Sequence, residues 1–196
     1  SSSIAAFGNM PELPGWPERR VIDVLIRESI ERLFDICQQD PRAWLSDTDL
    51  QCLLFSVLRQ YLPQHGISAS SVHSQVQIVL PPAPQVKGTK QPRTLRADVA
   101  LLVPHSLSPG NADATTEPAA VIQISRTFKV ETNIELLTRL VQSQGTPLVY
   151  LVVIAYKELE SDATRIRLLS QKHKVPVLVL NYWGKSEQVS RQPELL

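Results

Sequence analysis

The sequence has little of what the common cofactor and catalytic motifs require. Seven of its 196 residues are glycine, and they form neither a Gly-x-Gly-x-x-Gly pattern nor a Walker-type loop, which argues against the usual nucleotide-binding folds. The four histidines accompany no Gly-x-Ser-x-Gly element, so no hydrolase motif is indicated. The two cysteines, Cys37 and Cys52, are fifteen residues apart and make neither a zinc site nor a disulfide framework. We expect both thiols to be buried in helices, and a bridge between them stays open.

Long apolar runs and a strong charge of one sign are missing as well. No stretch of about 18 apolar residues predicts a membrane span, and the N-terminus has no basic segment followed by an apolar one. We therefore expect an intracellular protein, cytoplasmic or nuclear, with no membrane partner. The net charge of +1 gives no overall preference for nucleic acid, so the distribution of basic residues matters more than their sum.

Helical and strand patterns follow one another along most of the chain. Residues 1–17 predict a flexible lead-in or tag remnant, residues 18–44 a helical segment, residues 46–183 an α/β core and residues 184–196 a tail. Ser46 is a good N-cap for the second helix, which Pro63 and Gly66 close. Apolar spacing predicts further helices over 21–37, 132–144 and 161–174, and strands over 72–80, 95–103, 119–126, 148–155 and 175–182.

The order of these elements indicates an α/β fold. Three strands, followed by helix, strand, helix and strand, predict a mixed central sheet with helices on its faces. The first strand alternates, with Val72, Ser74, Val76 and Ile78 on one face and a more polar set opposite, so we predict that it is exposed on one side. The run at 148–155 is almost wholly apolar and predicts a central strand covered on both faces.

Polar side chains interrupt two of the apolar strands. Asp98 is the one carboxylate in the strand over 95–103, and Gln123 and Ser125 lie two residues apart in the strand over 119–126. Because side chains two apart on a strand share a face, Gln123 and Ser125 are expected to point the same way. Asp47 lies in the first turn of the second helix. It is either an acid that interacts favourably with the helix dipole or an acid at the rim of the core.

The segments SDTDLQ, RADVALLV and AAVIQISR, with the elements around them, resemble the common core of the PD-(D/E)xK nuclease superfamily over residues 46–156. The resemblance implies a restriction-endonuclease-like αβββαβ core, here with an N-terminal helix and an extra C-terminal αβ unit over 161–182. In that family an acid on the second strand and an acid-x-lysine triplet on the third form the active site. Asp98 matches the first acid, Gln123 the second acid, Ser125 the lysine, and Asp47 an acid that some members carry on the first core helix.

The same resemblance implies a Mg²⁺- or Mn²⁺-dependent phosphodiesterase acting on DNA or RNA, with the cation held by Asp98 and Gln123. Such a cation binds the scissile phosphate and activates a water, while the lysine positions the nucleophile. An amide oxygen at Gln123 can still be a metal ligand but brings no charge. Serine at position 125 lacks the positively charged ammonium group with which the family's lysine would face the phosphate. We therefore predict a site whose cleavage is impaired or lost.

Basic residues around this core are candidates for phosphate contacts, although a charged loop is also compatible with simple solvation. Three hypotheses stay open. The chain is a metal-dependent nuclease; or a nuclease-like module that binds nucleic acid or docks to a protein within a larger assembly; or an unrelated α/β domain in which Asp98 and Gln123 are ordinary hydrogen-bonded polar groups. The candidate nucleic-acid-binding residues are Lys87, Lys90, Arg93, Arg126, Arg165 and Arg167.

Overall fold

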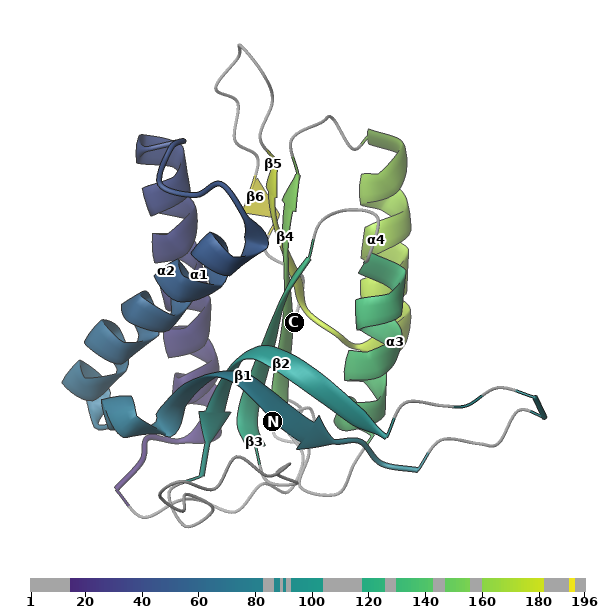
Figure 1. The fold of residues 1–196 in the computed structure, drawn as a ribbon, viewed down its shortest axis with the longest axis horizontal. Helices are drawn as coiled ribbons and strands as arrows, with labels where there is room; N and C mark the ends of the chain where they lie inside the picture. The colour runs from purple at the N-terminus through teal and green to yellow at the C-terminus, as the bar shows by residue number, and fades with distance from the viewer. Residues whose placement is uncertain are drawn as a thin grey trace, which may run out of the picture.

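The computed structural model describes residues 15–82, 87–88, 90, 93–103, 118–125, 130–142, 147–155, 160–181 and 191–192. These residues form three layers, a mixed sheet between two pairs of helices (Figure 1). Helices α1 (Arg19–Gln39) and α2 (Asp47–Tyr61) cover one face of the sheet, and α3 (Val130–Val141) and α4 (Glu160–His173) cover the other. The α/β class and the mixed sheet predicted from the sequence are confirmed. The expected lead-in before residue 15 and most of the expected tail lie outside the described residues.

The sheet runs in the order β1-β2-β3-β4-β5-β6, which is also the order of the strands along the chain. β1, β2 and β3 pair antiparallel, whereas β3, β4 and β5 pair parallel, with α3 and α4 as the crossover helices. The five predicted strands are confirmed within two residues at each end, and β6 was not predicted because two residues show no alternation. The bounds are β1 (Val72–Val79), β2 (Thr94–Leu102), β3 (Pro118–Ser125), β4 (Leu148–Ala155), β5 (Val177–Asn181) and β6 (Arg191–Gln192).

Local sequence explains where the helices begin and end. At the start of α2 the Ser46 hydroxyl accepts a hydrogen bond from the Asp49 N–H at 3.2 Å, as expected of an N-cap. The short helix η2 (Leu62–His65) ends at Gly66, whose φ of 86° suits a residue without a Cβ. No helix in the described part of the chain combines the length and the apolar character that a bilayer crossing needs.

The two cysteines differ in their surroundings. Cys37 is buried in α1, but Cys52 is exposed on α2, so the prediction of two buried thiols is wrong for Cys52. Cys52 lies between the buried residues Gln51 and Leu54 and points away from the sheet, because the buried stripe of α2 runs through Leu50, Leu54 and Leu58. Neither cysteine forms a disulfide.

The β1–β2 hairpin exchanges its two faces halfway along. Val72 packs in the core layer beneath α1 and α2, whereas Ile78 packs in the layer beneath α3 and α4. In a regular strand these two residues share a face, so the predicted single face of β1 is wrong. The cause is Gln75, whose φ of 53° inverts the alternation, and the pairing passes from Ser74 directly to Val76.

The second strand makes the same exchange at the opposite position. The partner register of β1 and β2 is constant on both sides of Gln75, which places Asp98 opposite it. Val99 then belongs to the layer beneath α1 and α2, and Ala97 to the layer beneath α3 and α4. Beyond this kink the hairpin leads away from α1 and α2 toward the side on which α3 lies (Figure 1).

Candidate functional site

Asp98 and Gln123 come together where β2 and β3 separate. β2 and β3 pair from Val99↔Ile122 to Leu102↔Pro118. On the N-terminal side of Val99, side chains provide the hydrogen bonds between the two strands. The Asp98 N–H donates to Gln123 Oε1 at 2.7 Å, and Gln123 Nε2 donates to the Arg96 carbonyl at 3.2 Å. The Ile124 N–H donates to Asp98 Oδ2 at 2.8 Å. Each side chain therefore satisfies the backbone of the neighbouring strand.

Two further glutamines continue this polar region across β1 to the helix layer. Gln75, at the kink opposite Asp98, donates from Nε2 to Gln51 Oε1 of α2 at 2.6 Å. Gln51 is buried although it is polar, and the amide of exposed Gln75 supplies its partner. We call Gln51, Gln75, Asp98 and Gln123 the strand cluster.

The other predicted active-site residues are placed less centrally. Ser125 is 2% exposed and alternates with Ile122 and Ile124, so it lies on the same face of β3 as Gln123. Asp47 is exposed in the first turn of α2. From α2, Gln51, one turn further along the helix, reaches Gln75 of β1, and near the end of the helix Arg59 Nη2 donates to the Val72 carbonyl of β1 at 3.0 Å. Arg126 lies outside the described residues.

The donor set of the strand cluster fits a divalent cation poorly. Mg²⁺ and Mn²⁺ favour several oxygen ligands, usually with more than one carboxylate. Here Asp98 supplies a carboxylate and Gln123 a neutral amide, and an oxygen of each already accepts a backbone N–H. In the described part of the chain, no group of three or more His, Cys, Asp and Glu is placed to hold a metal ion. The hydrogen bonds instead indicate that the cluster holds two diverging strands together.

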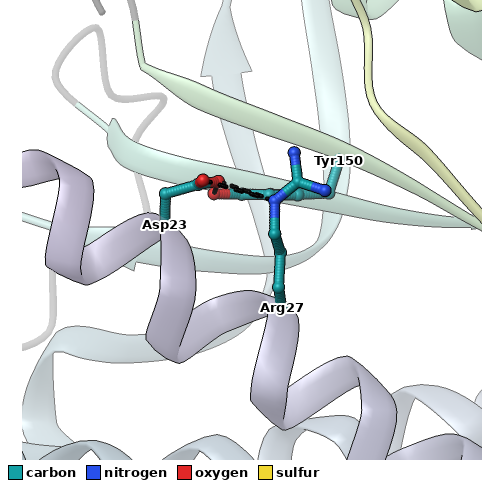
Figure 2. Close-up of polar contacts among 3 residues, drawn as sticks. All are labelled: Asp23, Arg27 and Tyr150. Atoms are coloured by element: carbon teal, nitrogen blue, oxygen red, sulfur yellow. Dashed lines mark hydrogen bonds and ion pairs between the residues drawn. The ribbon is translucent and has the colours of Figure 1, made fainter. Parts of the chain in front are cut away.

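A second polar cluster joins α1 to the centre of the sheet (Figure 2). The Tyr150 hydroxyl of β4 donates to Asp23 Oδ1 at 2.5 Å, and Arg27 Nε donates to the two Asp23 oxygens at 3.1 and 3.3 Å. Tyr150 is fully buried and Asp23 is 5% exposed. We call Asp23, Arg27 and Tyr150 the helix cluster.

Burial dominates the electrostatics of the helix cluster. Burial, and then the negative charge of Asp23 and the hydrogen bond to it, raise the pKa of Tyr150 well above its usual value. Burial also lowers the pKa of Arg19, which lies one turn before Asp23, against the opposing effect of Tyr150 and Asp23. Acid, base and phenol satisfy one another in this cluster, so it fixes α1 to β4.

The predicted nucleic-acid-binding residues fall into two groups. Lys87, Lys90 and Arg93 are exposed beyond the end of β1 or before the start of β2. On α4, Arg165 Nη2 lies 3.3 Å from Glu131 Oε1 of α3, so its charge is already paired, and Arg167 also has an interaction partner. The cations beside the hairpin are therefore better placed to bind an external anion than Arg165 is.

No protein-family model, curated protein or solved structure matches this chain. Its fold and its hydrogen bonds therefore carry the functional argument.

Sequence reasoning missed the partners of the polar residues more than the residues themselves. Gln51 lies next to Leu50 in the apolar stripe of α2, which is a readable signal of a buried amide. Asp23 lies similarly between Ile22 and Leu25, and a buried acid requires a partner. Gln75 gave no such signal, because glutamine has no preference for a left-handed backbone.

Proposed function

We propose that this chain is a nuclease-like domain of the PD-(D/E)xK type that has lost cleavage and acts by binding nucleic acid. The order α2-β1-β2-β3-α3-β4 supports it, because this is the αβββαβ succession that the sequence resemblance implies. Helix α1 precedes that core, and the unit α4-β5 follows it. Asp98 on β2 and Gln123 on β3 occupy neighbouring positions, as residues of one site would.

The hydrogen bonds that Asp98 and Gln123 make to the backbone are the observation that supports a loss of cleavage. Their oxygens accept the N–H groups of Ile124 and Asp98, and the Gln123 amide donates to Arg96. A catalytic cation would have to compete with these bonds and would gain one carboxylate and no lysine at position 125. The same residues that would form a metal centre thus hydrogen-bond to backbone groups of β2 and β3.

Charge distribution supports the binding half of the proposal. Residues 50–97 contain five Lys or Arg and no Asp or Glu, whereas the rest of the chain carries fifteen basic and nineteen acidic residues. A chain of almost neutral total charge therefore has one strongly basic segment. Grouped cations of this kind are what phosphate backbones attract.

Two measurements on the purified chain test the two halves separately. Supercoiled plasmid and labelled single strands, incubated with Mg²⁺ or Mn²⁺, are expected to remain intact. Fluorescence anisotropy with labelled oligonucleotides is expected to show binding that weakens as salt rises. Cleavage by the wild-type chain that disappears in Asp98→Ala would contradict the loss of activity, and absence of salt-sensitive binding would contradict the nucleic-acid function.

Protein docking is the second candidate, and exposed apolar side chains on α1 favour it. Val21 and Val24 are 42% and 47% exposed and lie three residues apart, so they share one outward face of the helix. In this alternative the nuclease-like fold serves as an interaction module of a larger assembly. A chain that binds no oligonucleotide, together with a change in sedimentation or partner capture on Val21→Glu/Val24→Glu substitution, would favour docking.

A further inference from the structure

The distal part of the β1–β2 hairpin presents a polar face to solvent. Residues 76–79 of β1 and 94–97 of β2 form a two-stranded antiparallel ribbon, which we call the ribbon. Gln77 lies directly opposite Arg96, and Val79 opposite Thr94, and all four side chains are exposed. Cross-strand neighbours share a face, so these side chains form one surface.

The kink at Gln75 is what turns this surface outward. Before the kink, the face that carries Val72 and Val99 packs beneath α1 and α2. After it, Ile78 and Leu95 pack on the other side of the sheet, beneath α3, and leave Gln77, Arg96 and their neighbours to solvent. Without the inversion, the alternation would direct apolar side chains to solvent at the end of the hairpin.

The ribbon is held to the protein at the end that leads into the connection between β1 and β2. The Leu80 N–H donates to the Arg93 carbonyl at 2.9 Å, which extends the hairpin by one closed pair beyond the strands. From α3, Arg139 Nη2 donates to the Pro81 carbonyl at 2.6 Å. Ile78, Leu80 and Leu95 are buried at 5% exposure or less. One face of the ribbon is thus fixed to the protein while the other remains accessible.

Among the described residues, no carboxylate forms an ion pair with the basic side chains of this region. Lys87, Lys90, Arg93 and Arg96 are exposed, and the described part of the chain offers none of them an ion pair. Other arginines differ, since Arg27 is bound to Asp23 and Arg165 to Glu131. Arg96 of the ribbon and the three cations beside it, which have no ion pair among the described residues, thus lie near the exposed amide of Gln77 and hydroxyl of Thr94.

We infer that the ribbon is a contact surface for B-form duplex DNA and lies in its major groove. This assignment rests on the nucleic-acid function proposed above. The major groove of B-DNA, about 12 Å wide, admits a two-stranded β-ribbon, whereas the deep and narrow major groove of A-form RNA does not. Arg96 and Gln77 are the side-chain types that bond guanine and adenine edges, and Lys87, Lys90 and Arg93, which lie in the connection between the two strands, are assigned to phosphates.

The first experiment compares two triple variants with equal loss of charge. Lys87→Ala/Lys90→Ala/Arg93→Ala removes the cations beside the ribbon, and Arg20→Ala/Arg42→Ala/Lys172→Ala removes three exposed cations elsewhere. Anisotropy with a labelled 20-base-pair DNA duplex, over a series of salt concentrations, gives the affinity and its salt slope. The ribbon triple is expected to bind ~10-fold or more weakly and to lose about two to three units of slope, and the control triple to change little.

The second experiment separates groove contact from simple charge attraction. Gln77→Ala/Arg96→Ala is expected to weaken binding to preferred duplex sequences by ~10-fold and to reduce the preference among sequences, since base contacts specify and phosphate contacts do not. Duplex RNA of the same sequence is expected to bind at least ~10-fold more weakly than DNA. Urea midpoints of all variants check that the fold is kept.

The outcomes distinguish this inference from the proposed function. Equal weakening by the two triples, or equal binding of duplex RNA, single-stranded and duplex DNA, would overturn the ribbon assignment while nucleic-acid binding stands. A wild-type chain that binds no nucleic acid at all would overturn the proposed function, and the ribbon assignment with it.

Discussion

The helix cluster and the strand cluster are both polar groups within the fold, but they satisfy different partners. In the helix cluster, Asp23, Arg27 and Tyr150 bond one another, side chain to side chain. In the strand cluster, Asp98 and Gln123 bond the backbone of strands that have stopped pairing. A polar side chain in an apolar strand therefore indicates catalysis only where the nearby backbone N–H and C=O groups already have other partners.

The largest effect is expected on removing the acid of the helix cluster. Asp23→Ala leaves the Arg27 charge and the Tyr150 hydroxyl without their partner, so we expect a loss of about 3–5 kcal/mol in the free energy of unfolding. Urea denaturation followed by circular dichroism measures it. Glu135→Ala, at an exposed acid on α3, is the control and should change stability by less than about 0.5 kcal/mol. A loss below about 1 kcal/mol for Asp23→Ala would mean that the cluster contributes little.

A smaller loss is expected from the amide of the strand cluster. Gln123→Ala leaves the Asp98 N–H and the Arg96 carbonyl unpaired at a site where Gln123 is 7% exposed, so we expect about 2 kcal/mol. Hydrogen exchange at the Asp98 amide should accelerate in the variant. Gln77→Ala, at an exposed glutamine of β1, is the matched control and should leave both stability and exchange nearly unchanged. Unaltered exchange at Asp98 would refute the role assigned to Gln123.

The two clusters also show which features of the fold and the site could be predicted from the sequence. The N-cap at Ser46 and the apolar run of β4 depend on near neighbours in the chain, so their patterns predicted α2 and a central strand. Asp98 and Gln123 were visible as polar residues in apolar strands, and their pairing on adjacent strands followed from the predicted order. Their hydrogen bonds to backbone could not be predicted, because these depend on where β2 and β3 diverge in space.

Two other features lay beyond the sequence for related reasons. The kink at Gln75 comes from a left-handed backbone that the surrounding fold imposes, since no glycine or asparagine marks the position. Tyr150 and Asp23 are 127 residues apart, so neither residue indicates the other, although each is polar in an apolar setting. Local patterns thus predicted the elements, and long-range contacts decided what the polar residues do.

The smallest loss of stability is expected from Tyr150→Phe. This loss should depend on pH, whereas the effect of changing the strand cluster should not. Tyr150→Phe removes the hydroxyl that donates to Asp23, which should cost about 1.5 kcal/mol at neutral pH. The folded wild-type protein keeps Tyr150 protonated because its pKa is raised well above 10.0, whereas the unfolded chain releases that proton near pH 10. Wild-type stability therefore falls as pH rises above 10 through this group, and the phenylalanine variant lacks that loss.

The difference between wild type and Tyr150→Phe should consequently shrink above pH 10 and be constant below about pH 9. Urea titrations of both proteins from pH 7 to pH 11 measure the difference, and groups common to both chains, such as Cys37, cancel. Gln123→Ala compared with wild type should show no such convergence, because its bonds to Asp98 N–H and the Arg96 carbonyl involve no titrating group. A difference for Tyr150→Phe that stayed constant to pH 11 would mean that the folded protein releases the phenol proton as easily as the unfolded chain.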